Sequence, residues 1–504
     1  MSTLAIEFTA SRLLQTVYGT SNIVWANVIG LVLLSLTAGY FLGGRIADRR
    51  PREGVFYTLV SAAGFCAVFF LLLTAVILRR AATALALLNV GAIAGSLLLV
   101  IVALVVPVTL LGCLSPFAIR LAVRDVDEAG RISGRIYAVS TLGSLLGTYL
   151  PVLVVIPLAG SRLAAVGFGT LLLLVGLIGL WRSGGRRARP VALLLPLLLL
   201  PPAALWLRGG LKAYPGQLYE TESAYNYIQV IRQGDCNYLL LNEGQAYHSF
   251  YCDGGRVPEV SVWSLMLAAP YFNVNPAPPG NSAVVGLAAG TIPKQFTRVF
   301  GPIPIDGIEL DPAIVETGRR YFDLNEPNIQ AHIGDGRNVL ERLPGPYDVI
   351  TVDAYKVPYI PWHLTTREFF GMVNERLSET GVLAINVGRV PNDRRLVDAV
   401  AATLATVFPT VHAIDVPGTL NTILVATRQP TTIGNLRANL AALPAAADPL
   451  LRDTLALAVA NVVPVALDGP VMTDDRAPVE TISDSIVLRY LLENGLAGLG
   501  TLGE

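Results

Sequence analysis

The sequence predicts a multi-pass α-helical membrane domain and a Rossmann-like α/β domain, with a small antiparallel β unit between them. Three observations lead to this fold class. Long apolar runs are confined to the part of the chain before residue 208. Up to Gly210 there are 17 Lys and Arg against 6 Asp and Glu, whereas the remainder has 20 against 31. After residue 282, short apolar segments alternate with helical patterns, as in a parallel sheet.

Six runs in the first 208 residues approach the roughly 20 apolar residues that a bilayer-spanning helix needs. They cover residues 23–43, 55–78, 85–111, 136–157, 163–181 and 191–207. The sixth run is shorter and is interrupted by Pro196, Pro201 and Pro202. We therefore predict a transmembrane domain over residues 1–208 with about six segments, embedded in the cell membrane with the lipid bilayer as its partner.

Arginine-rich loops predict the orientation of these helices. Clusters within residues 45–52, 120–135 and 182–189 alternate with poorer loops, so the rich loops are expected in the cytoplasm. If the sixth run spans the bilayer, the rest of the chain emerges outside the cell. If it is re-entrant or interfacial, the rest stays inside, which the need for a cytosolic nucleotide favours. Because the basic half is also the apolar half, the charge pattern excludes a nucleic-acid binder.

The predicted spans carry no unpaired Asp, Glu or Lys in their central parts. Ion-coupled transporters usually retain such groups, because charge inside the bilayer is costly and is kept for function. The composition therefore favours a membrane anchor over a transporter. The Gly-rich basic segment at residues 43–50 resembles a cytoplasmic loop of major-facilitator transporters, which keeps the transporter alternative open.

A small antiparallel unit is predicted over residues 215–255, with strands at 225–232, 238–241 and 246–251 and a tight turn at 242–244. Cys236 and Cys252 lie nearly symmetrically about that turn and could face each other across a hairpin. In the cytosol they would be free thiols. A disulfide between them would indicate that this half of the chain is extracytoplasmic.

Residues 256–430 are predicted to form the Rossmann-like domain, followed by a helical extension over 431–504. Strands are expected at 283–286, 305–310, 329–333, 348–352, 381–386 and 422–426. Helices are expected at 293–300, 312–322, 337–343, 366–377 and 397–407. In such sheets a ligand binds beyond the carboxyl ends of the strands, where the strand order reverses.

Four sets of residues stand at those strand ends. Gly286 and Gly290 bound a turn of small residues that a nucleotide could approach closely. Glu309 can accept both ribose hydroxyls, and Asp335 with Gly336 is placed to meet an adenine amino group. Asp353 would face the reacting atom. Singly, each has a structural alternative, since a strand-end Gly is often only a turn and a strand-end Asp is often a helix cap.

Together with their neighbours, these residues resemble the spermidine synthase (polyamine aminopropyltransferase) family, most closely its membrane-fused bacterial branch. The resemblance rests on the motifs at residues 242–249, 307–312, 334–337, 352–355 and 359–366, and covers residues 219–389. It extends to residues 11–14, Trp25 and the Gly-Gly-Arg loop in the first half. It also extends to residues 473–480 near the C-terminus.

The resemblance implies a class I S-adenosylmethionine-type fold with decarboxylated S-adenosylmethionine as co-substrate and a small-molecule amine, such as putrescine, as acceptor. It implies no metal and a homo-oligomer, in the first place a dimer. Asp353 would be the general base, since an ammonium must lose a proton before its nitrogen can attack. Asn226 and Gln245 would contact the donor. The acceptor pocket would be formed by Tyr247, His248, Tyr355 and Tyr359.

Two departures from the family pattern bear on the acceptor. Soluble spermidine synthases carry a second acidic residue three positions after the base, whereas this chain has Lys356. Tyr247 and His248 replace an Asp-Glu pair. An alternative is therefore a transferase that uses S-adenosylmethionine on a membrane or lipid-linked acceptor; a further one is a transporter with a nucleotide-sensing domain. His248 and His363 are candidates either for acid–base work or for hydrogen bonding alone.

Overall fold

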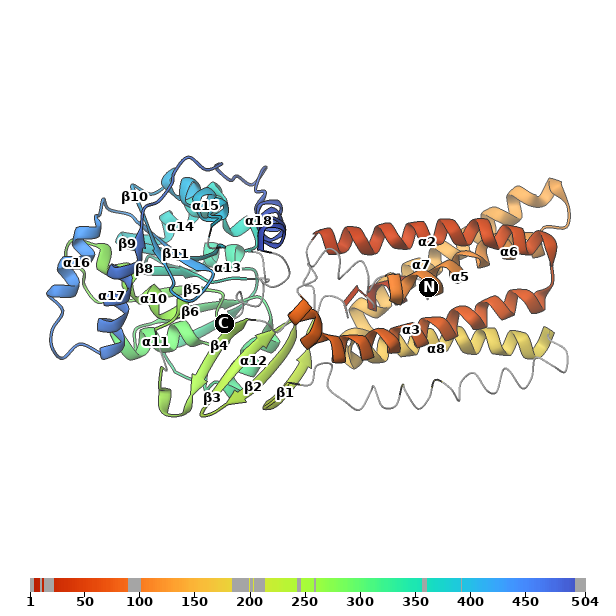
Figure 1. Ribbon diagram of the computed structural model, residues 1–504, viewed down its shortest axis with the longest axis horizontal. Helices are drawn as coiled ribbons and strands as arrows, with labels where there is room; N and C mark the ends of the chain where they lie inside the picture. The colour runs from red at the N-terminus through yellow and green to blue at the C-terminus, as the bar shows by residue number, and fades with distance from the viewer. Residues whose placement is uncertain are drawn as a thin grey trace. The chain divides into compact units, whose positions relative to one another are not determined.

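The computed structural model describes residues 4–9, 11–12, 22–88, 101–183, 199, 203, 214–242, 246–257, 260–355, 360–390 and 392–494. The chain divides into two compact units, shown as ribbons in Figure 1. The first comprises Met1–Tyr214 together with Glu222–Tyr227, and the second comprises Pro215–Thr221 together with Ile228–Glu504.

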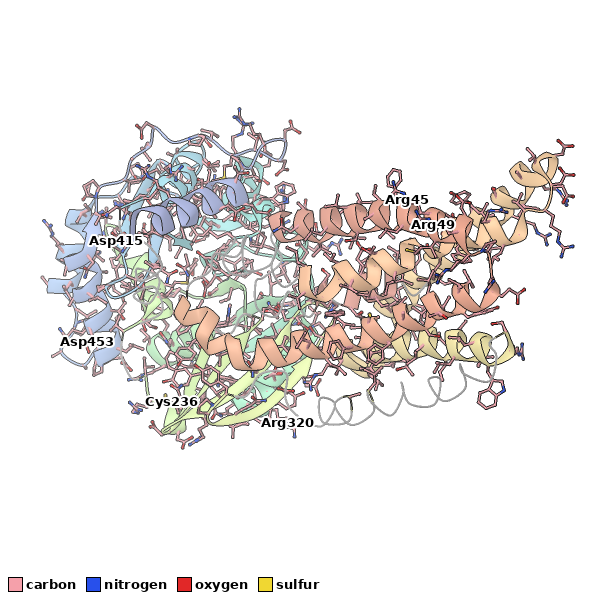
Figure 2. The ribbon with its side chains drawn as sticks, turned by 45° about the vertical axis from the view of Figure 1, so that its right-hand side comes forward. Arg45, Arg49, Cys236, Arg320, Asp415 and Asp453 are labelled. Atoms are coloured by element: carbon pink, nitrogen blue, oxygen red, sulfur yellow. A yellow bond between two sulfur atoms is a disulfide. The ribbon has the colours of Figure 1, made fainter. Side chains whose placement is uncertain are left out.

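The first unit is helical. Its main helices are α2 (Asn22–Arg49), α3 (Glu53–Leu88), α5 (Val106–Gly112), α6 (Leu114–Ala122), α7 (Ala129–Leu150) and α8 (Ile156–Ser183). Arg45 and Arg49 lie towards the end of α2, as Figure 2 shows. Within the described residues, five helical segments are long and apolar enough to cross a membrane. These are Ala26–Arg49, Glu53–Leu73, Ile101–Ala122, Val126–Val155 and Leu158–Ser183. They correspond to the first five predicted runs, whereas the sixth lies almost entirely outside the described residues.

Glycines let these helices approach one another closely. A Cβ atom on Gly43 of α2 would lie 2.4 Å from the carbonyl oxygen of Cys113, between α5 and α6. A Cβ atom on Gly64 of α3 would lie 2.4 Å from the backbone nitrogen of Leu173 in α8. Small residues of this kind give apolar helices the close backbone packing that stabilises bundles in a bilayer.

The second unit begins with a four-stranded sheet in the order β1-β2-β3-β4. Its strands are β1 (Gln217–Glu222), β2 (Tyr227–Gln233), β3 (Cys236–Leu241) and β4 (Tyr247–Cys252). The antiparallel pairing of β2 with β3 and of β3 with β4 confirms the predicted β unit, while β1 was not anticipated. Cys236 pairs with Cys252 across β3 and β4 and forms a disulfide with it (Figure 2).

An eight-stranded sheet forms the centre of the second unit, in the order β12-β10-β11-β9-β8-β5-β6-β7. The strands are β5 (Ser282–Val285), β6 (Ile305–Glu309), β7 (Ile329–Ile333), β8 (Tyr347–Val352), β9 (Leu377–Gly388), β10 (Thr410–Asp415), β11 (Asn421–Thr427) and β12 (Val462–Val463). β5 to β9 run parallel, as predicted. The edge beyond β9 is antiparallel instead, because β10 and β11 are consecutive strands joined by a short turn, which antiparallel pairing allows.

Helices pack on both faces of this sheet (Figure 1). They are α10 (Val262–Leu265), α11 (Thr291–Phe300), α12 (Pro312–Tyr321), α13 (Gly336–Arg342), α14 (Arg367–Arg376), α15 (Arg395–Ala405), α16 (Ile433–Ala441), α17 (Pro449–Asn461) and α18 (Val479–Asn494). One buried cluster contains Phe369 and Phe370, and another contains Phe272 and Phe296. These two apolar layers cover a Rossmann-like sheet, which confirms the predicted fold class.

The order of the central strands creates the predicted binding edge. β5 has β6 on one side and β8 on the other, so the chain reverses its direction of winding at β5. The carboxyl ends of these three parallel strands therefore meet at one edge of the sheet. The strands end at Val285, Glu309 and Val352, directly beside the predicted site residues.

Candidate active site

Gly286 and Asp353 are brought into contact where β5 and β8 end. The Asp353 N–H donates to the carbonyl oxygen of Val285 at 2.8 Å, which extends the parallel pairing by one residue. Gly286 has φ +92°, and a Cβ atom on it would lie 2.4 Å from the Asp353 carbonyl oxygen. Only glycine combines this left-handed conformation with so close an approach of two backbones. The glycine predicted to cradle a nucleotide thus also places the predicted base.

Both carboxylate oxygens of Asp353 accept a hydrogen bond. The Trp263 indole Nε1 donates to Oδ2 at 2.9 Å, and the Asn386 amide Nδ2 donates to Oδ1 at 2.9 Å. Asn386 is close because its neighbour Ile385 on β9 pairs with Val352 on β8. Burial raises the pKa of Asp353, and the two donors partly oppose that rise by stabilising the charged form. A carboxylate with a raised pKa and a fixed orientation is suited to take a proton.

Asn386 also presents a buried acceptor beside this carboxylate. Its side-chain Oδ1 has no hydrogen-bond partner among the described residues, although the residue is only 6% exposed. Its backbone oxygen accepts a bond from the Tyr355 hydroxyl at 3.0 Å. Burial, followed by the charge of Asp353, raises the pKa of Tyr355 well above its ordinary value, so the phenol stays neutral. A ligand N–H could therefore bond to Asn386 Oδ1 next to Asp353.

Glu309 spans the turn on the β6 side of the site. Its Oε2 accepts the backbone N–H of Ala288 at 3.0 Å and its Oε1 accepts that of Asp311 at 3.1 Å. Burial raises the pKa of Glu309, while these backbone donors lower it. Each carboxylate oxygen keeps a further lone pair, so the two ribose hydroxyls of a nucleotide could still donate to Glu309.

Gly290 closes the turn between β5 and α11. It is the N-cap of α11 with φ +94°, and a Cβ atom on it would lie 2.5 Å from Leu324 Cδ1. The turn is also held from β4, because the Ala289 N–H donates to Ser249 Oγ at 3.0 Å. The segment from Gly286 to Gly290 is thus fixed in a tight form in which Gly286 and Ala288 remain partly exposed.

Asp335 takes the structural role weighed for it, that of a helix cap. It is the N-cap of α13, where its Oδ1 accepts the Asn338 N–H at 3.1 Å. Its Oδ2 lies 2.8 Å from His363 Nε2, so His363 makes a hydrogen bond to a site residue. Gly336 follows directly, and a Cβ atom there would lie 2.6 Å from Val285 Cγ1. Contact of Asp335 with an adenine amino group stays a prediction.

The C-terminal extension binds the same loop. Arg337, the residue after Gly336, donates from Nη1 and Nη2 to the two carboxylate oxygens of Asp474 at 2.7 and 2.8 Å. The Thr366 hydroxyl adds a bond to Asp474 at 2.7 Å. The motif at residues 473–480 therefore connects the C-terminal segment to the candidate donor loop. The sequence alone does not reveal the partner of this motif, because Asp474 and Arg337 lie 137 positions apart.

His248 has an unusual place in β4. Leu239 pairs with Ser249 and Leu240 pairs with Tyr247, which leaves His248 as an extra, bulged residue. Its Nε2 has no hydrogen-bond partner among the described residues, and burial lowers its pKa to about 4. His248 is therefore neutral at physiological pH.

Tyr247, a further predicted pocket residue, has its contacts on the four-stranded sheet. Tyr247 is 42% exposed, its ring packs on Tyr238 at 4.5 Å, and its hydroxyl donates to Gln233 Oε1 at 3.3 Å. Asn226 lies in the segment grouped with the first unit. Gln245, Lys356 and Tyr359 lie outside the described residues. The roles predicted for all of these residues remain proposals.

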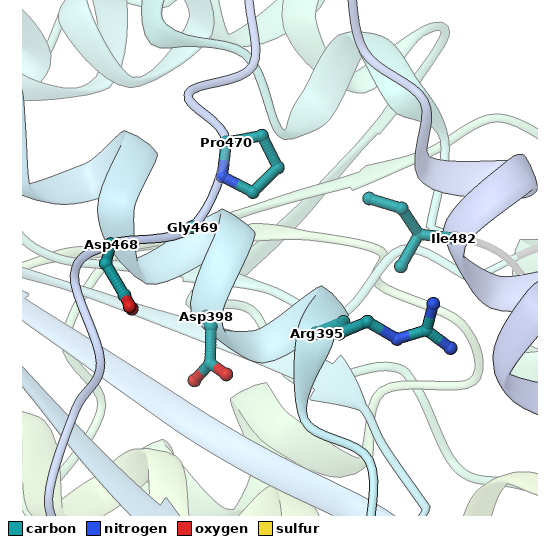
Figure 3. A pocket seen from close by; sticks show the side chains of 6 residues that line it. All are labelled: Arg395, Asp398, Asp468, Gly469, Pro470 and Ile482. Atoms are coloured by element: carbon teal, nitrogen blue, oxygen red, sulfur yellow. The ribbon is translucent and has the colours of Figure 1, made fainter.

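A separate pocket of about 300 Å³ lies beside α15, as Figure 3 shows. The residues that line it are Arg395, Asp398, Asp468, Gly469, Pro470 and Ile482. None of the predicted site residues is among them. Within the described parts of the chain, no group of three or more His, Cys, Asp or Glu is placed to hold a metal ion.

Known proteins with similar sequences include aminopropyltransferases. The spermine/spermidine synthase domain matches residues 290–427, which run from Gly290 to the end of β11. A probable polyamine aminopropyl transferase of Bifidobacterium longum is 34% identical over 213 residues, covering 41% of this chain and 46% of that protein. A polyamine aminopropyltransferase of Vibrio vulnificus is 29% identical over 208 residues, covering 40% of this chain and 68% of that protein.

A methyltransferase is also similar. The eEF1A lysine and N-terminal methyltransferase of Mus musculus is 31% identical over 158 residues, covering 29% of this chain and 22% of that protein. The chain thus spans less than half the length of the Bifidobacterium relative and about two thirds of the Vibrio relative. The matched domain includes Gly290, Glu309, Asp335, Gly336 and Asp353. Residues 290–427 thus match the spermine/spermidine synthase domain, and about two fifths of the chain is similar to polyamine aminopropyltransferases.

Proposed function

We propose that the protein is a membrane-bound aminopropyltransferase that moves an aminopropyl group from decarboxylated S-adenosylmethionine to an amine such as putrescine. The observation that carries this proposal is the placement of Asp353. A half-buried carboxylate with a raised pKa lies directly beside the glycine turn, and one strand, β5, separates its strand β8 from β6, which ends on Glu309. The proposed base and the residues proposed to bind the donor therefore lie at the same edge of the sheet.

The reaction balances with one base. The acceptor ammonium gives a proton to Asp353, which frees the nitrogen lone pair. That lone pair attacks the aminopropyl carbon next to the sulfonium, a new C–N bond forms, and the C–S bond breaks with its electrons going to sulfur. The products are the extended amine and methylthioadenosine. Because the sulfonium is already a good leaving group, positioning of the two reactants supplies most of the remaining acceleration.

The described residues can be assigned to donor and acceptor. Glu309 would hold the ribose hydroxyls, and the turn from Gly286 to Gly290 would accommodate the nucleotide. Asn386 Oδ1, the buried acceptor without a partner among the described residues, would bond a second N–H of the amine. Tyr355 lies beside it and would give the pocket an aromatic wall, a surface that suits cations.

The acceptor is the least constrained part of the proposal. Lys356 stands where the soluble family members carry an acid for the far end of a diamine. A cation there would repel a diammonium chain by about 1–4 kcal/mol at a separation near 4 Å. Monoamines should therefore be assayed beside putrescine.

The direct test is a product assay with the purified full chain. Decarboxylated S-adenosylmethionine and an amine should yield methylthioadenosine in amounts equal to the extended amine. Tight binding of the donor without any release of methylthioadenosine, over a panel of amines, would reject aminopropyl transfer and support a sensing domain.

A second candidate is favoured by the similarity to a methyltransferase. In that case intact S-adenosylmethionine would be the donor, and a membrane or lipid-linked group would be the acceptor. The same assay separates the two, because methyl transfer releases S-adenosylhomocysteine. Release of S-adenosylhomocysteine with lipid acceptors, and no methylthioadenosine with amines, would select this candidate.

The compartment of the second unit is also open to test. Supply of the nucleotide donor favours the cytoplasm, whereas the Cys236–Cys252 disulfide favours an oxidising, extracytoplasmic side. A C-terminal reporter that is active only in the cytosol should therefore be compared with one active only outside. Labelling of the two thiols in intact cells gives an independent answer. Protected thiols together with an externally active reporter would select the extracytoplasmic side.

A homodimer is proposed from the family resemblance alone. Light scattering on the detergent-solubilised chain should give twice the mass of 53.7 kDa after the detergent is subtracted. A mass of a single chain at micromolar concentration would reject the dimer without affecting the proposed reaction.

A further inference from the structure

Trp263 is the residue that bonds the outer oxygen of the Asp353 carboxylate. Its indole N–H reaches Oδ2 at 2.9 Å, across 90 residues of sequence. Asn386 occupies Oδ1, so the plane of the carboxylate is held from two sides. Each oxygen retains a lone pair that can receive a proton. The carboxylate is therefore oriented without being blocked.

Trp263 is itself held in place. It lies in the single turn of α10, which is fixed by reciprocal bonds between Ser261 and Ser264. Its ring packs on Phe250 with the centroids 5.5 Å apart. Phe250 is buried together with Cys236 and Cys252. The indole can therefore act as a rigid donor.

The residues that hold Trp263 in place also contact the turn from Gly286 to Gly290. The Phe250 N–H donates to Thr291 Oγ1 at 2.9 Å, and the Thr291 hydroxyl donates to the Phe250 carbonyl oxygen at 3.0 Å. Thr291 is the first residue of α11, directly after Gly290. One set of contacts therefore connects the donor turn, the Trp263 ring and the Asp353 carboxylate.

We propose that Trp263 is a positioning residue for the base: its indole N–H fixes the Asp353 carboxylate in the orientation that receives the proton of the acceptor amine. The kinetic consequence rests on the proposed function of Asp353. The hydrogen bond between Trp263 and Asp353 does not depend on that function, so the contact and its kinetic consequence can be tested separately. An indole is suited to this task, because it is a donor only and cannot itself take the proton.

The Trp263→Phe variant keeps an aromatic ring and removes the donor. A hydrogen bond to the charged carboxylate stabilises it, so its loss should move the acidic limb of the kcat profile upward by about one pH unit. We expect kcat at neutral pH to fall about tenfold and the KM for the donor to change less than about twofold. Trp181→Phe, in the first unit, is the matched control and should keep the wild-type profile.

Two other titratable groups lie on the elements around Asp353. Tyr355 has a pKa raised well above its ordinary value and stays neutral. His248 on β4 has a pKa lowered to about 4, so it titrates only at the acidic extreme. Lys356 lies outside the described residues. A pH dependence that is absent in Asp353→Asn comes from the carboxylate, whereas one that persists in this variant comes from another of these groups.

A second measurement does not need turnover. The full chain is labelled with 5-fluorotryptophan, and the Trp263 fluorine signal is identified by its loss in Trp263→Phe. We expect that signal to shift with pH as Asp353 titrates and to stay constant in Asp353→Asn. A titrating signal in an inactive wild-type protein would support the contact and reject aminopropyl transfer. The positioning role would be overturned if the Trp263 fluorine signal did not change with pH and the kcat profile of Trp263→Phe matched that of the wild type.

Discussion

The carbonyl oxygen of Asp353 occupies the space that a side chain on Gly286 would need. A Cβ atom on Gly286 would approach it to 2.4 Å, far inside normal contact distance. Two backbones from neighbouring strands thus touch at the point where the proposed donor site and the proposed base meet. Since Gly286 also has φ +92°, any other residue would meet both a strained conformation and a collision.

Gly286→Ala should therefore destabilise the protein and move the base. The left-handed conformation alone costs about 1 kcal/mol, and the collision adds about 1–3 kcal/mol of strain. Gly301→Ala is the control, because Gly301 has φ +85° but open space around its Cβ position. Thermal unfolding should show a larger loss for Gly286→Ala, together with a loss of turnover that Gly301→Ala does not share. Equal melting temperatures for the two variants would contradict the close approach.

Glu309→Gln should weaken donor binding. A hydrogen bond to a charged group contributes about 1.5–3 kcal/mol, so the KM for the donor is expected to rise about 10–100-fold. Glu316→Gln, on the exposed face of α12, changes the same charge outside the site and should leave the KM unchanged. An unaltered donor KM in Glu309→Gln would remove Glu309 from the donor site.

Turnover should depend on the ionisation of Asp353. Burial raises its pKa, so the base is protonated, and inactive, up to a higher pH than an ordinary carboxyl with a pKa of about 3.9. The activity should therefore rise with pH through the raised pKa. A kcat profile that is flat between about pH 4 and 7 would contradict this assignment.

The same shift has a consequence for stability. A carboxyl whose folded-state pKa is raised destabilises the fold when it is ionised and no longer does so when it is protonated. Asp353→Asn should consequently melt at or above the wild-type temperature at neutral pH. The difference should shrink as the pH falls through the raised pKa. A variant that is less stable than the wild type at pH 7, with no narrowing in acid, would show that the charge is stabilised by its two donors.

Asp474→Asn should loosen the contact between the C-terminal segment and the start of α13, where Gly336 and Arg337 lie. A bidentate pair with a further hydroxyl bond is stronger than a single exposed ion pair, but it remains partly solvated. We expect about a 3–10-fold increase in the donor KM with kcat nearly unchanged. The neighbouring Asp475→Asn is the control, since Asp475 is exposed and its substitution should have no effect. Identical kinetics in both variants would limit Asp474 to holding the C-terminal segment.

Sequence patterns predict the strand-end acids well. Glu309 and Asp353 each follow an apolar strand, so their positions at the sheet edge follow from the alternation of strands and helices. The partners of Asp353 could not be found in this way. Trp263 lies 90 residues and Asn386 33 residues away, and neither stands in a pattern that distinguishes it from a core residue. Only the register of β8 and β9 and the packing of Phe250 bring these donors to the carboxylate.

The limits of periodicity are also visible at the far edge of the sheet. β10 was not predicted, because Thr410–Asp415 mixes apolar and polar residues over only six positions. Without β10, the sequence pattern predicts a parallel strand at 422–426, whereas β11 pairs antiparallel with β9. The error does not reach the site, which is built from the parallel strands β5, β6 and β8.

The role of Asp353 is tested by measuring methylthioadenosine release by the wild-type chain and by Asp353→Asn, each supplied with decarboxylated S-adenosylmethionine and saturating amine. We expect stoichiometric release by the wild type and about a 10²–10⁴-fold lower rate in the variant, with donor binding retained. An Asp353→Asn protein that turned over at the wild-type rate would contradict the central claim that Asp353 is the base.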